Sequence, residues 1–188
     1  MNANSGFTLF ELMIVMLIVG ILAAIGVPSY RYVTSSNRVA TEVNSLLGDM
    51  QYARAEAIKE GEPVTVCVST NGSSCATSDT NWNHGWIVFG DSNPTGSGNH
   101  VVNSGEPVLR IQAAFPQDTF VADNSFGWVT FNREGFGATG TTNNVTITLH
   151  APNNVSEWTR CLTITPVGMV SLQRAGGIAP GSTTSTCS

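Results

Sequence analysis

The amino-acid sequence predicts an α+β protein in which one long N-terminal helix packs on an antiparallel β-sheet domain, with the first half of the helix embedded in a membrane. Three patterns support this fold class. Residues 7–27 are almost entirely apolar, residues 29–60 repeat apolar side chains at helical spacing, and residues 63–172 contain short alternating segments rich in β-branched residues. The helix therefore comes first in the chain, and the strands follow it.

The apolar run of residues 7–27 is long enough to cross the core of a bilayer as a helix. Glu11 is the only charged residue in this run. An ionised carboxylate at bilayer depth costs roughly 2.5 kcal/mol or more, so Glu11 is expected to have a compensating partner. The run predicts a membrane segment over residues 7–28, with Glu11 as its candidate functional residue.

Residues 29–60 are expected to continue the helix as an amphipathic stem. Side chains recurring three, four and seven residues apart form a stripe that is apolar except for one arginine: Val33, Ala40, Val43, Leu47, Met50, Arg54 and Ala57. Leu46, Ala53 and Ile58 widen this stripe. Gly61, followed by Pro63, is a typical stop for a helix. A bend is expected at residues 26–28, because proline removes a backbone donor from the helix.

Residues 61–188 have the character of a β domain. Seven alternating, β-branched segments are expected as strands: residues 63–68, 85–89, 107–111, 126–131, 145–149, 160–165 and 169–172. Segments rich in Gly, Asn, Ser and Thr separate several of them. The tail from residue 176 is expected to be flexible except where Cys187 ties it to the body.

The composition is that of a folded, weakly acidic protein. The chain has 188 residues, of which 41% are apolar and 11% are charged, and its net charge is −5. The apolar content excludes a disordered chain, and the negative charge argues against nucleic-acid binding by bulk electrostatics. About 160 residues follow the membrane segment, which fits a single globular domain with a helical stem.

The four cysteines, Cys67, Cys75, Cys161 and Cys187, all lie beyond the membrane segment. An even number in this position favours disulfides in an oxidising compartment such as the periplasm, and three connectivities are possible. We favour Cys67–Cys75, which closes a short polar loop, together with Cys161–Cys187, which pins the tail. A zinc site is the alternative, although the sequence has no C-x-x-C and no cysteine beside a histidine.

The sequence offers no catalytic constellation. Its three histidines are scattered, and no serine or cysteine lies in a recognisable nucleophile motif. Residues 135–140 read G-x-G-x-x-G, but they lead into another expected strand rather than a helix, so we expect a β-turn there. We therefore expect neither enzyme activity nor a cofactor or metal.

The N-terminal pattern Gly6-Phe7-Thr8-Leu9-Phe10-Glu11-Leu12 resembles the signal of type IV pilins and pseudopilins. Pro28 and Tyr30 fall where that superfamily has a helix-kinking proline and an aromatic residue. A secretory signal peptide fits less well, because no Lys or Arg precedes the run and no clean cleavage site follows it. A plain membrane anchor would explain the length of the run but not Glu11.

The resemblance implies a type IV pilin fold and a cleaved leader of residues 1–6. A prepilin peptidase would cut between Gly6 and Phe7, and Phe7 would then be N-methylated. The protein would be a single-pass protein of the inner membrane with its domain in the periplasm, and would later become part of a filament. The leader contains no Lys or Arg, so the orientation of the protein in the membrane would depend on the amine of Met1 and on Arg31 and Arg38.

The resemblance also implies how the protein would assemble. Residues 7–28 would form the transmembrane helix and then the helix of the filament core, with Glu11 and Pro28 serving assembly. Glu11 would meet the N-terminal amine of a neighbouring subunit, which is the cation that a buried carboxylate needs. The expected partners are other pilins or pseudopilins, the prepilin peptidase and the inner membrane.

A second resemblance, to the GspH/FimT/FimU group, covers most of the chain to about residue 133. It is carried by residues 51–59 and 64–67, by Gly85-Trp86-Ile87-Val88-Phe89 and by Asp91. Members of this group have different functions. The resemblance implies a minor pilin that primes the assembly of a type IV pilus, with a GspH-type minor pseudopilin of a type II secretion system and a FimT-like DNA-uptake pilin as alternatives.

DNA binding is the least supported of these functions. FimT-like pilins carry a basic Gly-Arg-x-Arg-like motif, and the matching positions here hold Met169 and Ser171. Three arginines are candidate phosphate contacts: Arg133, Arg160 and Arg174. Two or three such contacts give only weak, salt-sensitive binding.

Overall fold

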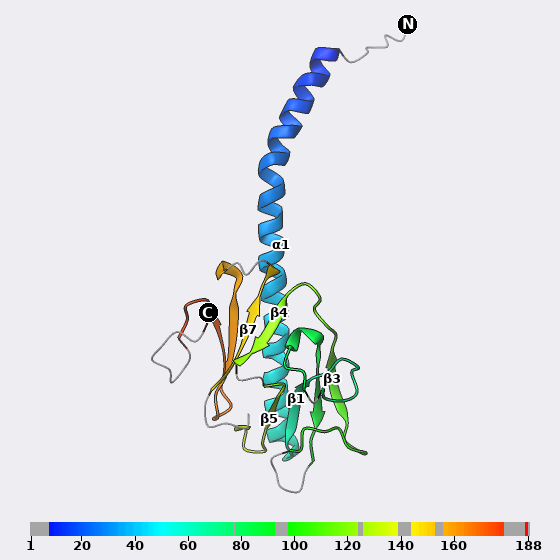
Figure 1. Ribbon diagram of the computed structural model, residues 1–188, viewed down its shortest axis with the longest axis vertical. Helices are drawn as coiled ribbons and strands as arrows, with labels where there is room; N and C mark the ends of the chain where they lie inside the picture. The colour runs from blue at the N-terminus through cyan, green and yellow to red at the C-terminus, as the bar shows by residue number, and fades with distance from the viewer. Residues whose placement is uncertain are drawn as a thin grey trace. The chain divides into compact units, whose positions relative to one another are not determined.

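The computed structural model describes residues 8–76, 78–92, 98–123, 126–138, 144–152, 156–178 and Cys187. The chain divides into two compact units, Met1–Arg38 and Val39–Ser188. The described part of the first unit is almost entirely helical, whereas the second unit contains the last part of that helix and the described strands (Figure 1). This order of elements agrees with the predicted α+β class.

Helix α1 runs from Leu9 to Glu60 and is continuous through Pro28. It ends where the sequence predicts, because Gly61 takes a φ of 72° and its N–H donates to the carbonyl oxygen of Ala57 at 3.0 Å. Glycine adopts this left-handed conformation without the steric cost that a Cβ brings. The expected bend at residues 26–28 stays a prediction.

The strands form two antiparallel sheets. The first has the order β3-β2-β1-β5-β6 and the second has the order β4-β7-β8-β9. The first sheet consists of β1 (Val64–Val68), β2 (Trp86–Gly90), β3 (Val108–Gln112), β5 (Trp128–Phe131) and β6 (Gly137–Ala138). The second consists of β4 (Thr119–Ala122), β7 (Val145–His150), β8 (Arg160–Ile164) and β9 (Val170–Arg174). Two short 3₁₀ turns complete the described elements, η1 (Trp82–His84) and η4 (Ser156–Trp158).

The burial pattern of a strand reflects its place in the sheet. In β1 every residue is buried, since α1 covers one face of the strand and loops cover the other, and β1 pairs with both β2 and β5. In β4 buried and exposed residues alternate, which suits an edge strand with one wet face.

All seven predicted strands are present, with ends shifted by one or two residues. The strands β4 and β6 were not predicted. Each is short, and within the described residues β6 pairs through Thr130 with Ala138 and through Phe131 with Gly137. Strands of two to four residues carry too little alternation to be detected against turn-rich surroundings.

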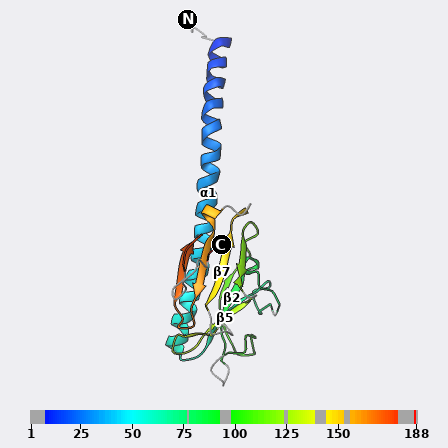
Figure 2. The same ribbon diagram turned by 60° about the vertical axis from the view of Figure 1, so that its left-hand side comes forward.

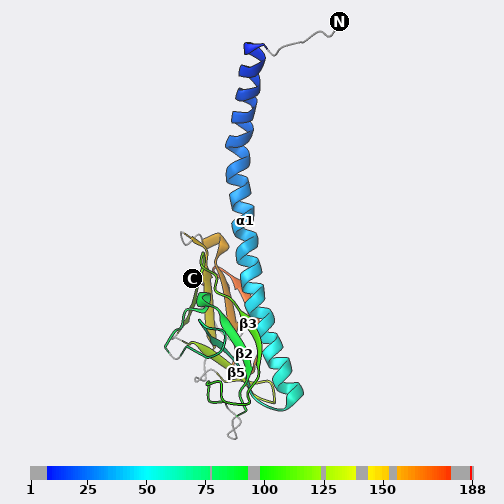
Figure 3. The ribbon, with the colours of Figure 1, turned by 90° about the vertical axis from the view of Figure 1, so that its right-hand side faces the viewer.

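The larger of two hydrophobic cores joins the Val39–Glu60 part of α1 to both sheets, and a smaller one contains Cys67, Ile87 and Phe89. Figure 3 shows this part of α1 beside β2 and β3 of the first sheet, and Figure 2 turns the molecule so that β7 of the second sheet can be followed. The largest buried side chains of the core are Trp82, Trp86, Phe120, Phe131, Leu46 and Met50. The aromatic rings of Trp82, Trp86 and Phe120 lie close together, with Trp86 at 6.5 Å from Trp82 and 6.3 Å from Phe120.

The buried stripe of α1 agrees with the predicted one at several positions, whereas the predicted members Val33 and Ile58 are exposed. Its apolar members are spaced four and three residues apart: Val39, Val43, Leu46, Met50, Ala53 and Ala57. Ala40 and Leu47, which the pattern placed in the stripe, are half-buried. Asp49 also lies among the buried residues of α1 and contacts the first sheet.

Candidate assembly site

Glu11 lies in the first turn of α1. Its backbone N–H donates to the Oγ1 of Thr8 at 3.2 Å, so Thr8 caps the helix. The sequence Thr-x-x-Glu is the capping-box pattern, in which the hydroxyl of the first residue accepts from the N–H of the fourth. Thr8 is thus a contributor to the site that our sequence analysis missed, although the pattern is legible in the sequence.

The position of Glu11 at the start of α1 suits a negative charge. A carboxylate at the N-terminus of a helix interacts favourably with the helix dipole. The side chain is exposed, and no residue in the described part of the chain forms an ion pair with it. The predicted partner, an amine on another subunit, would therefore find the carboxylate open to contact.

The first half of α1 presents an apolar surface around its whole circumference. Its mean hydropathy reaches 2.7 over an 18-residue window, and none of that window is buried. By length and composition, α1 is the one helix of the described residues that could cross a membrane. Large apolar side chains from Leu9 to Val33 are 43–77% exposed. A surface of this kind is stable only in lipid or against other proteins.

The site residues of the N-terminus divide into two groups. Pro28 and Glu11 both lie in α1 and are separated by about 26 Å along the axis at 1.5 Å per residue. Gly6 and Phe7, together with the predicted leader of residues 1–6, lie outside the described residues. The predicted cleavage and methylation therefore stay predictions from the sequence.

Asp49 links the stem part of α1 to the first sheet. The indole N–H of Trp86 donates to its Oδ2 at 2.9 Å, and the guanidinium of Arg110 donates to its Oδ1 at 2.9 Å. The same guanidinium lies 3.8 Å from the ring centroid of Tyr52, which is also on α1. Asp49 is 8% exposed, so these two donors supply the hydrogen bonds that burial would otherwise remove from its carboxylate.

The contacts of Arg54 explain why this charged residue interrupts the apolar stripe of α1. Its Nε donates to the carbonyl oxygen of Gly135 at 2.9 Å, and one terminal nitrogen donates to the carbonyl oxygen of Val167 at 3.5 Å. These carbonyls belong to the turn between β5 and β6 and the turn between β8 and β9. Arg54 therefore joins the two sheets to the helix at one end of the domain.

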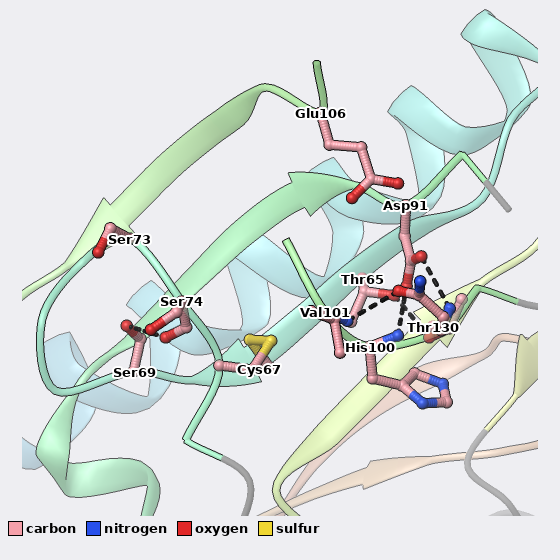
Figure 4. The surroundings of a disulfide bond; sticks show 12 residues. Thr65, Cys67, Ser69, Ser73, Ser74, Asp91, His100, Val101, Glu106 and Thr130 are labelled. Atoms are coloured by element: carbon pink, nitrogen blue, oxygen red, sulfur yellow. Dashed lines mark hydrogen bonds between the residues drawn. A yellow bond between two sulfur atoms is a disulfide. The ribbon is translucent and has the colours of Figure 1, made fainter. Parts of the chain in front are cut away.

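The cysteines form the two disulfides that our sequence analysis favoured, Cys67–Cys75 and Cys161–Cys187. The first closes the loop after β1, in which the hydroxyl of Ser69 donates to the carbonyl oxygen of Ser74 at 2.7 Å (Figure 4). The second holds Cys187, which is 1% exposed, against β8. With every cysteine of the chain in a disulfide, the zinc-site alternative lacks its thiolate ligands.

A buried carboxylate also fixes the loop near the first disulfide. Asp91, which is fully buried, accepts from the hydroxyl of Thr65 at 2.8 Å and from the backbone N–H groups of Asn99 and His100 at 2.8 and 2.9 Å (Figure 4). His100 stacks on Trp128 with ring centroids 3.5 Å apart. Burial lowers the pKa of the His100 imidazole, and the charge of Asp91 offsets this only in part.

The three candidate DNA contacts are not brought together as one group. Arg160 and Arg174 are direct neighbours across β8 and β9. Arg133 lies in the turn after β5 and forms an ion pair with Glu134 at 2.8 Å. One of the nitrogens of Arg160 already donates to two backbone carbonyls, those of Glu157 and Thr159. The described residues thus offer one pair of neighbouring cations, and no group of three metal-ligating side chains.

Two protein families match the sequence. The family described as type II transport protein GspH matches residues 42–168, and the prokaryotic N-terminal methylation motif matches residues 1–27. Together they cover residues 1–27 and 42–168, which include most of α1 and most of the β domain. The second match includes Gly6, Phe7 and Glu11.

Curated relatives match part of the chain. A fimbrial protein of Pseudomonas aeruginosa is 38% identical over 86 residues, which is 46% of this chain and 51% of that protein. A type IV major alpha-pilin of Moraxella bovis is 48% identical over 63 residues, which is 33% of this chain and 38% of that protein. The chain thus spans about half the length, or less, of these curated relatives.

Solved structures match over most of the chain. Two crystal forms of the type IV minor pilin FimU of Pseudomonas aeruginosa superpose with TM-scores of 0.54 and 0.52. The sequence identities are 21% and 23%, and the matches cover 81% and 78% of this chain and 98% of the FimU chain. At this identity the likeness shows a shared fold.

Proposed function

Because the chain belongs to the GspH family of the type IV pilin superfamily, we propose that it is a minor pilin that enters a type IV pilus through its N-terminal helix and helps to assemble or prime the filament. The families concerned are structural and non-enzymatic. The observation that carries the proposal is the exposed apolar first half of α1, with Glu11 as its only charge between Leu9 and Tyr30.

The same helix serves two environments in turn. Before assembly, residues 7–28 lie in the inner membrane and the domain lies in the periplasm. During assembly, the helix leaves the lipid and packs among the helices of other subunits, where its apolar surface stays away from water. Each exchange replaces apolar lipid contacts by apolar protein contacts, so the helix never has to expose that surface to solvent.

Glu11 gives the assembled helix its axial position. Once the leader has been removed, a neighbouring subunit presents a free N-terminal amine, which is the counter-ion that the carboxylate lacks in its own chain. In an apolar filament core an unpaired carboxylate would be costly, so subunits align where the pair forms. Thr8 keeps the first turn of the helix intact and thus holds the carboxylate in place.

The cleavage of the leader has a direct test. Gly6→Asp is expected to block the peptidase, because the active site then has to accept a charged side chain next to the scissile bond. Mass spectrometry of the purified protein measures this. The native chain should have lost residues 1–6 and gained one methyl group on Phe7, whereas an unchanged mature mass in the variant would refute the proposed processing.

A GspH-type pseudopilin of a type II secretion system is the second candidate, and the description of the matching family favours it. A strain that lacks the gene separates the two functions when surface pilin and secreted protein are quantified side by side. Loss of surface pili with normal secretion supports the minor pilin. Loss of secretion with intact pili supports the pseudopilin, and normal levels of both leave DNA uptake as the function to examine.

A further inference from the structure

The apolar part of α1 ends in the sequence Tyr30-Arg31-Tyr32. All three residues are exposed, with Tyr30 at 73% and Tyr32 at 50%. Consecutive residues of a helix point about 100° apart, so the three side chains surround the helix instead of sharing one face. A surface that packs against a partner helix would place its residues three and four positions apart. A ring of this composition suits a plane that the helix passes through.

The ring lies at a definite distance from Glu11. Arg31 follows Glu11 by 20 residues, and α1 is continuous between them. At 1.5 Å per residue, the two charges are about 30 Å apart along the axis, which is about the thickness of the hydrocarbon core of a bilayer. No charged residue lies between them. The two charges therefore match the two boundaries of the apolar layer.

We infer that Tyr30, Arg31 and Tyr32 form an anchor that binds the phosphate groups of phospholipids in the periplasmic leaflet of the inner membrane. Until assembly, this anchor holds Glu11 at the headgroup boundary of the opposite leaflet. The inference rests on the proposed function, since it takes residues 7–28 as the membrane segment of the unassembled subunit. Tyrosine is enriched at membrane interfaces, because its ring is apolar and its hydroxyl is polar. A guanidinium binds phosphate oxygens in a bidentate manner.

The inner end of the helix has the composition that this position requires. The first turn contains Thr8 and Glu11, and the aromatic ring of Phe10, between them in sequence, is 72% exposed. At a headgroup boundary the carboxylate stays hydrated and avoids the cost of burial at bilayer depth. Glu11 becomes buried only when the helix enters the filament.

Cysteine labelling in the full-length protein tests this depth. The native cysteines are all in disulfides, so a single introduced cysteine reports alone. Three variants each have one introduced cysteine, at Leu12, Ile18 or Ser29. Each variant is labelled with a membrane-impermeant maleimide in native membrane vesicles, once in right-side-out vesicles and once in inverted vesicles. Leu12→Cys should react from the inner side and Ser29→Cys from the outer side, each about tenfold faster than Ile18→Cys, which lies about 9 Å deeper than Leu12. Equal rates at Leu12 and Ile18 would overturn the inference.

The anchor itself is tested by replacing all three side chains with leucine. The apolar run then extends to Val33, so the outer end should sink into the lipid, and labelling of Ser29→Cys should fall about tenfold. The matched control, Tyr30→Trp with Arg31→Lys and Tyr32→Trp, keeps aromatic rings and a cation and should keep the labelling. Unchanged labelling in the leucine variant would overturn the anchor. Neither measurement needs a filament, so failure here and failure of the proposed function are distinguishable.

Discussion

Replacing Asp49 by alanine should destabilise the β domain more than replacing its charged partner Arg110. The reason is that the carboxylate satisfies two donors with different surroundings. The indole N–H of Trp86 is fully buried and has Asp49 as its acceptor at 2.9 Å. The side chain of Arg110 is 47% exposed, so water can replace the carboxylate there.

The expected magnitudes follow from these exposures. In Asp49→Ala, an unsatisfied buried indole N–H costs about 2 kcal/mol, and the half-exposed ion pair adds roughly 0.5–1 kcal/mol, for a total of about 3 kcal/mol. In Arg110→Ala, the ion pair and the stacking on Tyr52 are lost, at about 1 kcal/mol in all. Asp49→Asn keeps an acceptor for Trp86 and should cost about 1 kcal/mol.

Urea and thermal unfolding of the Val39–Ser188 unit measure these differences. For a domain of this size, about 3 kcal/mol corresponds to a fall in Tm of roughly 6–12 °C. The geometry predicts the largest loss of stability for Asp49→Ala, and smaller losses of similar size for the separate variants Asp49→Asn and Arg110→Ala. Equal losses for Asp49→Ala and Arg110→Ala would show that the indole bond contributes nothing, and the reasoning would then be wrong.

Three further predictions concern the same domain. Cys187→Ser opens a disulfide with a sequence separation of 26 and should lower the free energy of unfolding by about 3 kcal/mol in urea melts, and an unchanged midpoint would contradict this. His100→Asn should flatten the pH dependence of stability. Because the folded-state pKa of His100 is depressed, the native protein should lose stability as pH falls below about 6.5, and an identical profile in the variant would contradict this. Gly168→Ala should destabilise the domain by about 2 kcal/mol or more, since the φ of Gly168 is 77° and a Cβ would collide with the carbonyl oxygen of Gly135. Its control, Gly48→Ala, lies in an open position on α1 and should stabilise the domain by up to about 1 kcal/mol. Thermal melts that rank the two variants otherwise would refute both predictions.

The main elements of the fold were predictable because each has a strong local pattern. The helix has a long apolar run, then a repeating stripe, then Gly61, and the structure has α1 end at Glu60. The division of the strands into two sheets was not predictable, since alternation tells which face of a strand is buried but not which strand is its neighbour. The short strand β4 (Thr119–Ala122) illustrates this, because its partner β7 lies about 25 residues further along the chain.

The site was predictable in part for the same reason. Glu11 is conspicuous as a lone charge, and the favoured cysteine pairs follow from short and terminal loops. The contacts of Asp49 were not predictable, because its donors, Trp86 and Arg110, lie 37 and 61 residues away in the sequence and meet it only in the folded domain. Thr8 could have been found from the capping-box spacing alone.

The central claim, that Glu11 directs entry of this subunit into a filament, has one direct measurement. It is the amount of this protein in filaments sheared from cells, relative to the amount in the membrane, for the native chain and for Glu11→Ala. Loss of the carboxylate should leave membrane levels unchanged and lower the filament fraction about tenfold or more, because an amine would then be buried without its partner. A filament fraction equal to that of the native chain would contradict the claim.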